Sequence, residues 1–263
     1  MNLGGRTALV TGATGGLGQA IARALARRGA TLILSGRQED VLSALATELR
    51  ARTVVCDLAD RAQVEQLARE VADADVLVAN AGVPASGLIG SLSLEQIDRA
   101  LDVNLRAPML LARLLCEGMA ARGGGHIVFV NSTSGKTGTV GQAVYCASKF
   151  GLRGYAQGIR EDLRPLGVGV SSVFPSFIRD AGMFHDSGAK LPPYVGTKTP
   201  EDVARAVIRA IEHDRSEIDV APVPVRVGSA VQNVVPEFAA RVQRALGADK
   251  IAARVSDGQR GKL

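Results

Sequence analysis

The chain has 263 residues, of which 46% are apolar, 22% are charged and 3% are aromatic. This composition is typical of a globular protein and excludes the disordered and fibrous classes. No apolar run approaches the roughly 18 residues of a membrane-spanning helix, and residues 1–14 lack the apolar core of a signal peptide. The cysteines form no CxxC pair, so we expect no disulfide framework, no structural zinc site and a location in the reducing cytoplasm.

The net charge of +5 is concentrated at one end of the chain. Residues 241–263 hold six basic and two acidic side chains and so carry +4 of it. A face that binds nucleic acid would combine basic residues with aromatic side chains or a known reading module, and neither is present. We interpret this end as a solvated tail and expect no nucleic-acid partner.

From residue 7 onward, short runs of β-branched residues alternate with longer segments of helical periodicity, which predicts parallel strands joined by helices. We therefore expect an α/β fold, a single doubly wound parallel sheet of Rossmann type with helices on both faces, over residues 1–247, and a basic tail over residues 248–263. The expected strands are 7–10, 31–34, 53–56, 76–79, 126–131, 169–174 and 218–220, and the expected helices are 17–28, 41–50, 63–71, 94–121 and 143–163.

Two stretches interrupt the alternation. Residues 175–199 precede a helix that we expect to begin with Thr199 as N-cap and Pro200 in its first turn, and a connection of this length is typical of a lid or substrate loop. Residues 229–246 have the pattern of an amphipathic helix interrupted by Pro236.

The first expected strand runs into a glycine-rich turn, Thr11-Gly12-Ala13-Thr14-Gly15-Gly16-Leu17-Gly18, which an expected helix follows. Glycines let the backbone approach a pyrophosphate closely, and the amide groups at the start of the helix then meet its charge. This position favours a dinucleotide-binding loop over a plain tight turn.

The GxxxGxG spacing of Gly12, Gly16 and Gly18 resembles that of the short-chain dehydrogenase/reductase family, in its simple one-domain branch. Further motifs of this family follow in order and at family intervals over residues 7 to about 220, namely Asp57, Asn80-Ala81-Gly82, Asn104, Ser132 and Tyr145-Cys146-Ala147-Ser148-Lys149. The resemblance implies a nicotinamide cofactor held by Gly12, Thr14, Gly16, Leu17, Gly18, Arg37, Asp57, Leu58, Asn80, Ala81, Gly82, Tyr145, Lys149 and Pro175, with Asp57 at the adenine amino group.

The end of the second expected strand, Leu34-Ser35-Gly36-Arg37, carries no acidic residue. A carboxylate there would accept hydrogen bonds from the adenosine ribose of NAD, whereas the Arg37 guanidinium can hold the additional phosphate of NADP through two hydrogen bonds. We therefore predict NADP(H) as the cofactor. The alternative is that Arg37 only pairs with Glu39 or Asp40 at the surface.

Tyr145 and Lys149 lie four residues apart in an expected helix, so their side chains share one face. The Lys149 ammonium is expected to lower the pKa of the phenol, whose ionisation at neutral pH otherwise costs roughly 4 kcal/mol. Ser132, at the end of an expected strand, can turn its hydroxyl toward the phenol, and this pair can move a proton while a cofactor moves a hydride. By resemblance, Asn104 holds a water that links Lys149 to solvent, which completes the catalytic set Asn104, Ser132, Tyr145 and Lys149.

The sequence departs from the family after the sixth expected strand. The family usually has Pro-Gly there and a Thr five residues after the Pro, whose hydroxyl contacts the nicotinamide carboxamide. This chain has Pro175-Ser176 and Asp180 at these positions. The charge of Asp180 argues against a simple transfer of the threonine's role.

Other reactive residues are interpreted as structural. Cys146 adjoins Tyr145 but points about 100° away on a helix, which indicates a packing role. His126, His185 and His213 share no ligand spacing, so no metal is expected.

We expect an NADP(H)-dependent oxidoreductase that interconverts a ketone or aldehyde and an alcohol, most of all a hydrophobic one, because four of the nine aromatic residues lie between residues 174 and 194. That loop could instead pack on its own domain or on a neighbouring subunit. The alternatives are a non-catalytic dinucleotide-binding regulatory or scaffold protein and an enzyme anchored at a membrane surface by residues 229–263. By family resemblance, residues 94–121 and 143–163 pair between subunits in a homodimer or homotetramer.

Overall fold

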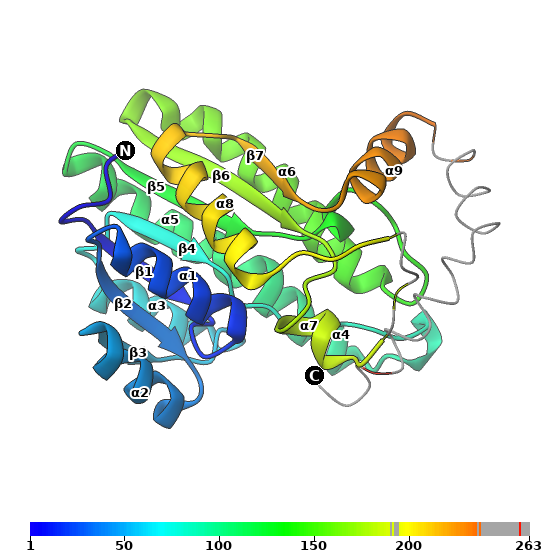
Figure 1. Cartoon of the computed structure of the whole chain (residues 1–263). Helices are drawn as coiled ribbons and strands as arrows, with labels where there is room; N and C mark the ends of the chain where they lie inside the picture. Colours follow the sequence, from blue (N-terminus) through cyan, green and yellow to red (C-terminus); the bar gives the residue numbers. More distant parts are fainter. Residues whose placement is uncertain (190, 192–194, 236, 238–257, 259–263) are drawn as a thin grey trace.

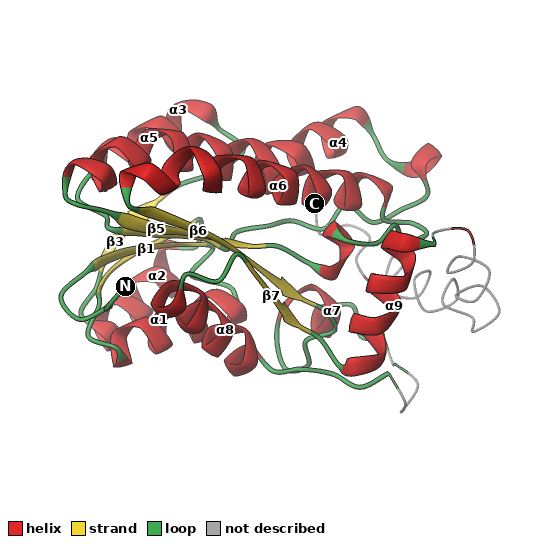
Figure 2. Ribbon diagram, turned by 90° about the horizontal axis from the view of Figure 1, so that it is seen from above, coloured by secondary structure: helices red, strands yellow, loops and turns green. Residues whose placement is uncertain are grey.

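The computed structural model describes residues 1–189, 191, 195–235, 237 and 258, which form a three-layer α/β structure (Figures 1 and 2). Its parallel sheet has seven strands in the order β3-β2-β1-β4-β5-β6-β7, so the chain crosses from one half of the sheet to the other after β3. The predicted fold class is confirmed, and each strand lies within two residues of its expected bounds. The strands are β1 (Thr7–Thr11), β2 (Thr31–Gly36), β3 (Arg52–Val55), β4 (Val76–Ala79), β5 (Gly125–Val130), β6 (Val168–Pro175) and β7 (Glu217–Val220).

Helices cover both faces of the sheet. Figure 2 shows α3, α4, α5 and α6 on one face and α1, α2 and α8 on the other. The helices are α1 (Gly16–Arg27), α2 (Glu39–Leu49), α3 (Arg61–Glu70), α4 (Leu94–Leu101), α5 (Ala107–Ala121), α6 (Ala143–Leu163), α7 (Gly182–Asp186), α8 (Pro200–His213) and α9 (Val223–Val234). In the described part of the chain, no helix combines the length and the apolar character needed to cross a membrane.

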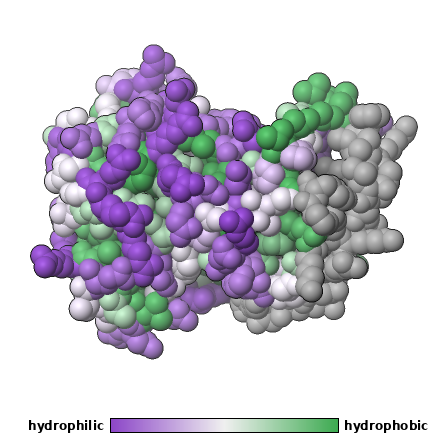
Figure 3. Space-filling view, in the orientation of Figure 1, coloured by the Kyte–Doolittle hydropathy of each residue, from purple (hydrophilic) through white to green (hydrophobic). Residues whose placement is uncertain are grey.

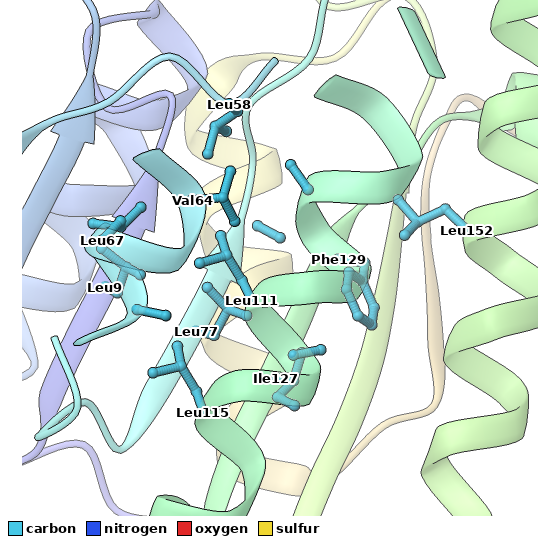
Figure 4. Close-up of a cluster of buried hydrophobic side chains, with 14 of the residues drawn as sticks. Leu9, Leu58, Val64, Leu67, Leu77, Leu111, Leu115, Ile127, Phe129 and Leu152 are labelled. Atoms are coloured by element: carbon cyan, nitrogen blue, oxygen red, sulfur yellow. The ribbon is translucent and has the colours of Figure 1, made fainter. Parts of the chain in front are cut away.

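Two apolar cores lie between these layers. Alternate strand residues point to opposite faces, so Leu9 contributes to one core and Val10 to the other. In Figure 4, strand residues such as Leu77 and Phe129 pack toward Leu111 of α5. Because both faces are covered, the central strands are apolar over most of their length, which explains why they were recognisable in the sequence.

The single helix predicted over residues 94–121 is interrupted in its middle, so this prediction is wrong there. Residues Asp102–Arg106 form a π-helical turn between α4 and α5, in which the amide of Ala107 donates to the carbonyl oxygen of Asp102. Pro108, in the first turn of α5, has no amide hydrogen to continue the regular pattern at this point. π turns of this kind occur often at functional sites, and this one carries Asn104.

The C-terminal third departs from expectation at one helix. The start of α8 is confirmed, with the Thr199 and Asp202 side chains forming a reciprocal capping box. The amphipathic helix begins at Val223 instead of residue 229, because Pro222 and Pro224 favour a helix start there. Val223, Val227 and Val234 of this helix are exposed, and Figure 3 shows a hydrophobic surface over α9. The continuation of the predicted helix beyond residue 237 and the basic tail lie outside the described residues, apart from Gly258.

Candidate active site

The carboxyl ends of the central strands open into a cavity of about 390 Å³. A doubly wound sheet binds its ligands at this edge, where the strand order changes direction. Of the predicted site residues, only Asn104 does not line the cavity. The predicted residues that do are Gly12, Thr14, Gly16, Leu17, Gly18, Arg37, Asp57, Leu58, Asn80, Ala81, Gly82, Ser132, Tyr145, Lys149 and Pro175.

The glycine-rich turn forms one wall because side chains larger than hydrogen would not fit. Gly12 has a φ of 63°, and a Cβ on Gly18 would overlap the carbonyl oxygen of Gly12. Gly15, the N-cap of α1, offers no side chain to the first amides of that helix. These amides and the positive helix end make an anion site, which suits a pyrophosphate.

Asn80 fixes this wall against the next strand. Its Nδ2 donates to the carbonyl oxygens of Thr11 and Gly12 at 3.0 and 3.2 Å, and its amide donates to Thr11 Oγ1. Asn80 therefore holds the turn after β1 to the end of β4. Asn80, predicted as a cofactor-binding residue, thus also positions the glycine-rich turn.

Arginine side chains mark the end of the cavity at β2 and β3. Arg37 is exposed and, among the described residues, forms no ion pair with Glu39 or Asp40. Asp57 lies nearby and pairs with Arg99 at 3.3 Å. Burial acts to raise the pKa of Asp57, but hydrogen bonds from Ala59 and Arg99 and the charge of Arg37 lower it overall. The cavity thus combines a carboxylate that stays ionised with an available guanidinium.

The opposite end of the cavity holds the predicted proton-transfer group. Tyr145 and Lys149 project from the first turns of α6, and Lys149 Nζ lies 5.7 Å from the centroid of the Tyr145 ring. Lys149 Nζ donates to the Val130 carbonyl oxygen at 3.2 Å. Ser132, the second residue after β5, hydrogen-bonds toward the phenol. The structure therefore brings Ser132, Tyr145 and Lys149 together, as predicted.

Burial governs the ionisation of this group in the protein alone. Burial raises the pKa of Tyr145 to about 12, and hydrogen bonding by Ser132 only partly opposes this. Burial also lowers the pKa of Lys149 to about 8. Lys149 is not among the causes of the Tyr145 shift, so the expected lowering of the phenol pKa by the ammonium and the nicotinamide ring stays a prediction. Tyr145 is a protonated donor at neutral pH.

The matching of the chain to known proteins agrees with this geometry. The family model for short chain dehydrogenases matches residues 6–192. The chain belongs to the short-chain dehydrogenase family. This short-chain dehydrogenase is therefore an NAD(P)-dependent oxidoreductase, and the family inferred from the motifs is confirmed.

Relatives of this short-chain dehydrogenase include named ketoacyl reductases. It is 34% identical over 259 residues to ketoacyl reductase HetN of Nostoc sp., covering 93% of this chain and 90% of the relative. It is 36% identical over 217 residues to 3-oxoacyl-(acyl-carrier-protein) reductase FabG of Rickettsia bellii, covering 79% and 89%. A solved short-chain dehydrogenase from Sphingobium yanoikuyae in complex with NADPH has a TM-score of 0.77 at 26% identity, covering 91% of this chain and 95% of that one.

Asn104 is the one predicted catalytic residue of this short-chain dehydrogenase that does not line the cavity, unlike Ser132, Tyr145 and Lys149. It is buried behind the cavity wall, where its Oδ1 accepts from the Val83 amide at 2.8 Å and its Nδ2 donates to the Val83 carbonyl oxygen at 2.9 Å. Its Nδ2 also lies 3.4 Å from Ser148 Oγ. The side chain thus joins the π turn to the loop after β4, and its catalytic role stays a prediction.

Sequence reasoning missed several polar residues that line the cavity, among them Asn131 and Arg99. Asn131 follows β5 and donates from Nδ2 to the Lys149 carbonyl oxygen at 3.1 Å, while its Oδ1 accepts from the Ser132 amide at 2.9 Å. Its position as a polar residue at the end of a buried strand could have identified Asn131 from the sequence. Arg99, on α4, forms an ion pair with Asp57, and no sequence pattern connects two residues so far apart in the chain.

The departure from the family pattern has a structural outcome. Asp180 has a φ of 70°, is exposed and pairs with Arg179 at 3.3 Å. It does not line the cavity, whereas Ile178 and Ala181 on either side do. Asp180 therefore does not take the place of the family's threonine hydroxyl.

The aromatic residues between 174 and 194 do not form one apolar mouth. Phe174 is fully buried in the domain, and Phe177 and Phe184 pack edge to face with ring centroids 5.1 Å apart. Phe184 and Met183 of α7 line the cavity, and Tyr194 lies outside the described residues. The segment therefore both packs on its own domain and borders the site.

The residues interpreted as structural behave accordingly. Cys146 is buried and its Sγ donates to the Thr137 carbonyl oxygen at 3.6 Å. His126 is buried with its Nε2 2.8 Å from Ser171 Oγ, and burial lowers its pKa to about 4. Within the described ranges, no cluster of His, Cys, Asp and Glu has the arrangement of a metal site.

Proposed function

We propose that this short-chain dehydrogenase interconverts a carbonyl compound and an alcohol with NADP(H), using Tyr145 as the proton donor and acceptor. The observation that carries the proposal is the convergence of Ser132, Tyr145 and Lys149 at one end of a cavity whose other end presents a glycine turn and Arg37. Residues 1–247 would form one catalytic domain with 175–199 as its substrate loop.

The residues present fit the dinucleotide. Gly18 packs against the backbone of Gly12 and Ala13, which holds the turn close to the start of α1, where the first helical amides can face a pyrophosphate. Arg37 can bind the 2′-phosphate that distinguishes NADP from NAD, while Asp57 can accept from the adenine amino group. When bound, NADPH supplies the hydride that reduces a carbonyl carbon.

The protein's own contribution is to move a proton at the carbonyl oxygen. Tyr145 is protonated at neutral pH and can donate to that oxygen, and the Ser132 hydroxyl can donate a second hydrogen bond where negative charge develops. Lys149, with a pKa of about 8, carries charge on much of the population at neutral pH and stabilises the phenolate that remains. Alcohol oxidation uses the same groups in reverse, with the phenolate as base.

A 3-oxoacyl thioester is the first substrate class to test. The supporting observations are the names of the relatives, ketoacyl reductase and 3-oxoacyl-(acyl-carrier-protein) reductase, and the apolar cavity residues Val83, Met183 and Phe184. A panel of 3-oxoacyl thioesters, cyclic ketones and aldehydes, followed by NADPH absorbance, tests the activity and the substrate class together. Tight NADPH binding without turnover of any compound would favour a dinucleotide-binding scaffold instead.

We also propose that the enzyme assembles as a homodimer or homotetramer in the cytoplasm. Leu114 of α5 and Phe150 of α6 are 45% and 42% exposed, which leaves apolar side chains on the two helices expected to pair. All three cysteines are free, as a reducing compartment requires. Sedimentation showing a monomer at micromolar concentration would contradict the assembly.

A further inference from the structure

Four charged side chains form an ion network beside the candidate site, and none of them lines the cavity. Lys136 Nζ lies 2.7 Å from Asp219 Oδ1 and 3.0 Å from Glu217 Oε2. Arg153 donates to both carboxylate oxygens of Glu217, at 2.7 and 3.1 Å. Gln157 adds a further hydrogen bond to Glu217 Oε1 at 3.1 Å. Glu217 is therefore the centre of the network.

Much of this network is removed from solvent. Lys136 is only 8% exposed, and its Nζ lies 3.9 Å from the ring centroid of the fully buried Phe174. Burial acts to raise the pKa of Glu217, but hydrogen bonds from Arg153 and Lys136 lower it overall. The desolvation of buried ion pairs commonly offsets their attraction, so stability is a weak reason for such a network. Its geometry is more informative.

One branch of the network leads to Ser132. This residue is the N-cap and Lys136 the C-cap of the single 3-10 turn Thr133–Gly135. A Cβ on Gly135 would lie 2.7 Å from Asn131 Oδ1 and 2.8 Å from the Lys149 carbonyl oxygen, so the turn is closely fitted to the site. A displacement of Lys136 would therefore reach Ser132 through one short turn.

The other branch leads to Tyr145. Arg153 lies one helical turn after Lys149 and two turns after Tyr145 on α6, which is a continuous helix over this span. Its partner Glu217 begins β7, the edge strand that pairs with β6 (Figure 1). The same carboxylate thus holds the turn that carries Ser132 and the helix that carries Tyr145.

We propose that Glu217 is a positioning residue, which sets the separation of the Ser132 and Tyr145 hydroxyls through Lys136 and Arg153. This inference rests on the proposed function, because it assigns the two hydroxyls to one substrate oxygen. The cofactor end of the cavity is built on β1 and β2, at a distance of several strands from β7. Loss of Glu217 should therefore alter turnover and leave cofactor affinity unchanged.

The central experiment compares Glu217→Gln with Glu48→Gln. Glu48 accepts from Arg23 through a similar two-contact pair, at 2.7 and 2.8 Å, on α1 and α2 away from the proton-transfer group. With the best carbonyl substrate of the panel, Glu217→Gln should lower kcat by about tenfold to a hundredfold, as a small misplacement of reacting groups does. The Kd of NADPH, measured by its fluorescence, should stay at the wild-type value, and Glu48→Gln should match the wild type throughout.

The pH profile gives a readout that a purely structural role would not move. Hydrogen bonding by Ser132 lowers the pKa of Tyr145, and Lys149 and Cys146 are the other ionisable groups close to the phenol on α6. Weakening the Ser132 contact should raise the phenol pKa. The rising limb of kcat for alcohol oxidation should then move to higher pH in Glu217→Gln, since oxidation needs the phenolate.

A second pair of variants serves if Glu217→Gln does not fold. Lys136→Arg keeps the cation and should retain most of kcat, while Lys136→Met should lose it to the same extent as Glu217→Gln. Two results for Glu217→Gln would overturn the inference. One is a wild-type kcat with no shift in the rising limb of its pH profile, and the other is a loss of NADPH affinity together with the loss of kcat. A wild-type protein that reduces no carbonyl of the panel would overturn the proposed function and this inference with it.

Discussion

The two ends of the cavity are constructed in different ways. The cofactor end is made largely of backbone from one contiguous segment, in which Gly12 and Gly18 shape a turn between β1 and α1. The proton-transfer end is made of side chains from α6 and from the segment that follows β5, held in place by contacts such as Asn131 to Lys149. The first end should therefore govern mainly cofactor binding and the second mainly turnover, with Lys149 as the residue expected to serve both.

The largest expected effect is at the proton-transfer end. Tyr145→Phe removes the proton donor and should lower kcat by about 10³-fold, within the range of general acid catalysis. NADPH affinity, measured by fluorescence, should stay nearly unchanged. Tyr155→Phe is the matched control, because Tyr155 donates to the Met109 carbonyl oxygen outside the cavity. Near-normal turnover in Tyr145→Phe would require a different proton donor.

Lys149→Met should separate function from stability at the same end. Turnover should be lost and NADPH affinity reduced, because by family resemblance the ammonium also contacts the nicotinamide ribose. The free protein should nevertheless gain about 2 kcal/mol at neutral pH, since burial lowers the Lys149 pKa from 10.5 to about 8 and the lost Val130 contact offsets part of the gain.

The sign of the pH dependence follows from proton binding. Between pH 8 and 10.5 the unfolded chain holds the Lys149 proton and the folded chain does not, so this residue penalises folding at neutral pH and the penalty disappears as pH rises. The free energy of unfolding of the wild type should thus approach that of Lys149→Met over this interval. Urea unfolding measures both free energies. If their difference stayed constant between pH 8 and 10.5, burial would not lower the Lys149 pKa.

Gly18→Ala tests the cofactor end. The added methyl group would overlap the Gly12 carbonyl oxygen, and overpacking of this kind costs about 1 to 3 kcal/mol. We expect weaker NADPH binding and a lower Tm. Gly4→Ala is the control, since Gly4 does not line the cavity and its Cβ would lie 3.5 Å from the nearest atom, an ordinary contact. Equal NADPH affinities in the two variants would remove the argument for a closely fitted turn.

The smallest effect concerns the choice between cofactors. Arg37→Ala should remove most of the preference for NADPH over NADH, about 1 to 2 kcal/mol for one charge-assisted contact. Titration of both cofactors by fluorescence measures it, with Arg61→Ala as a control for general charge, because Arg61 pairs with Glu65 on α3. Equal affinities in the unmodified protein would contradict the assignment.

The sequence by itself determined the features that depend on neighbours along the chain. The strands were legible because a parallel sheet covered on both faces requires continuous apolar runs. The turn between Gly12 and Gly18 needs glycine for local steric reasons, and the four-residue spacing of Tyr145 and Lys149 fixes their common face on α6. Each of these follows from short-range geometry.

Tertiary structure alone decided what depends on distant partners. The Arg99 pair with Asp57 and the junction of Lys136 and Arg153 at Glu217 join residues that no local pattern relates. The direction of the Tyr145 pKa also belongs here, because burial raises this pKa by more than the hydrogen bond with Ser132 lowers it. Burial is a property of the packed domain, and a helical spacing does not contain it.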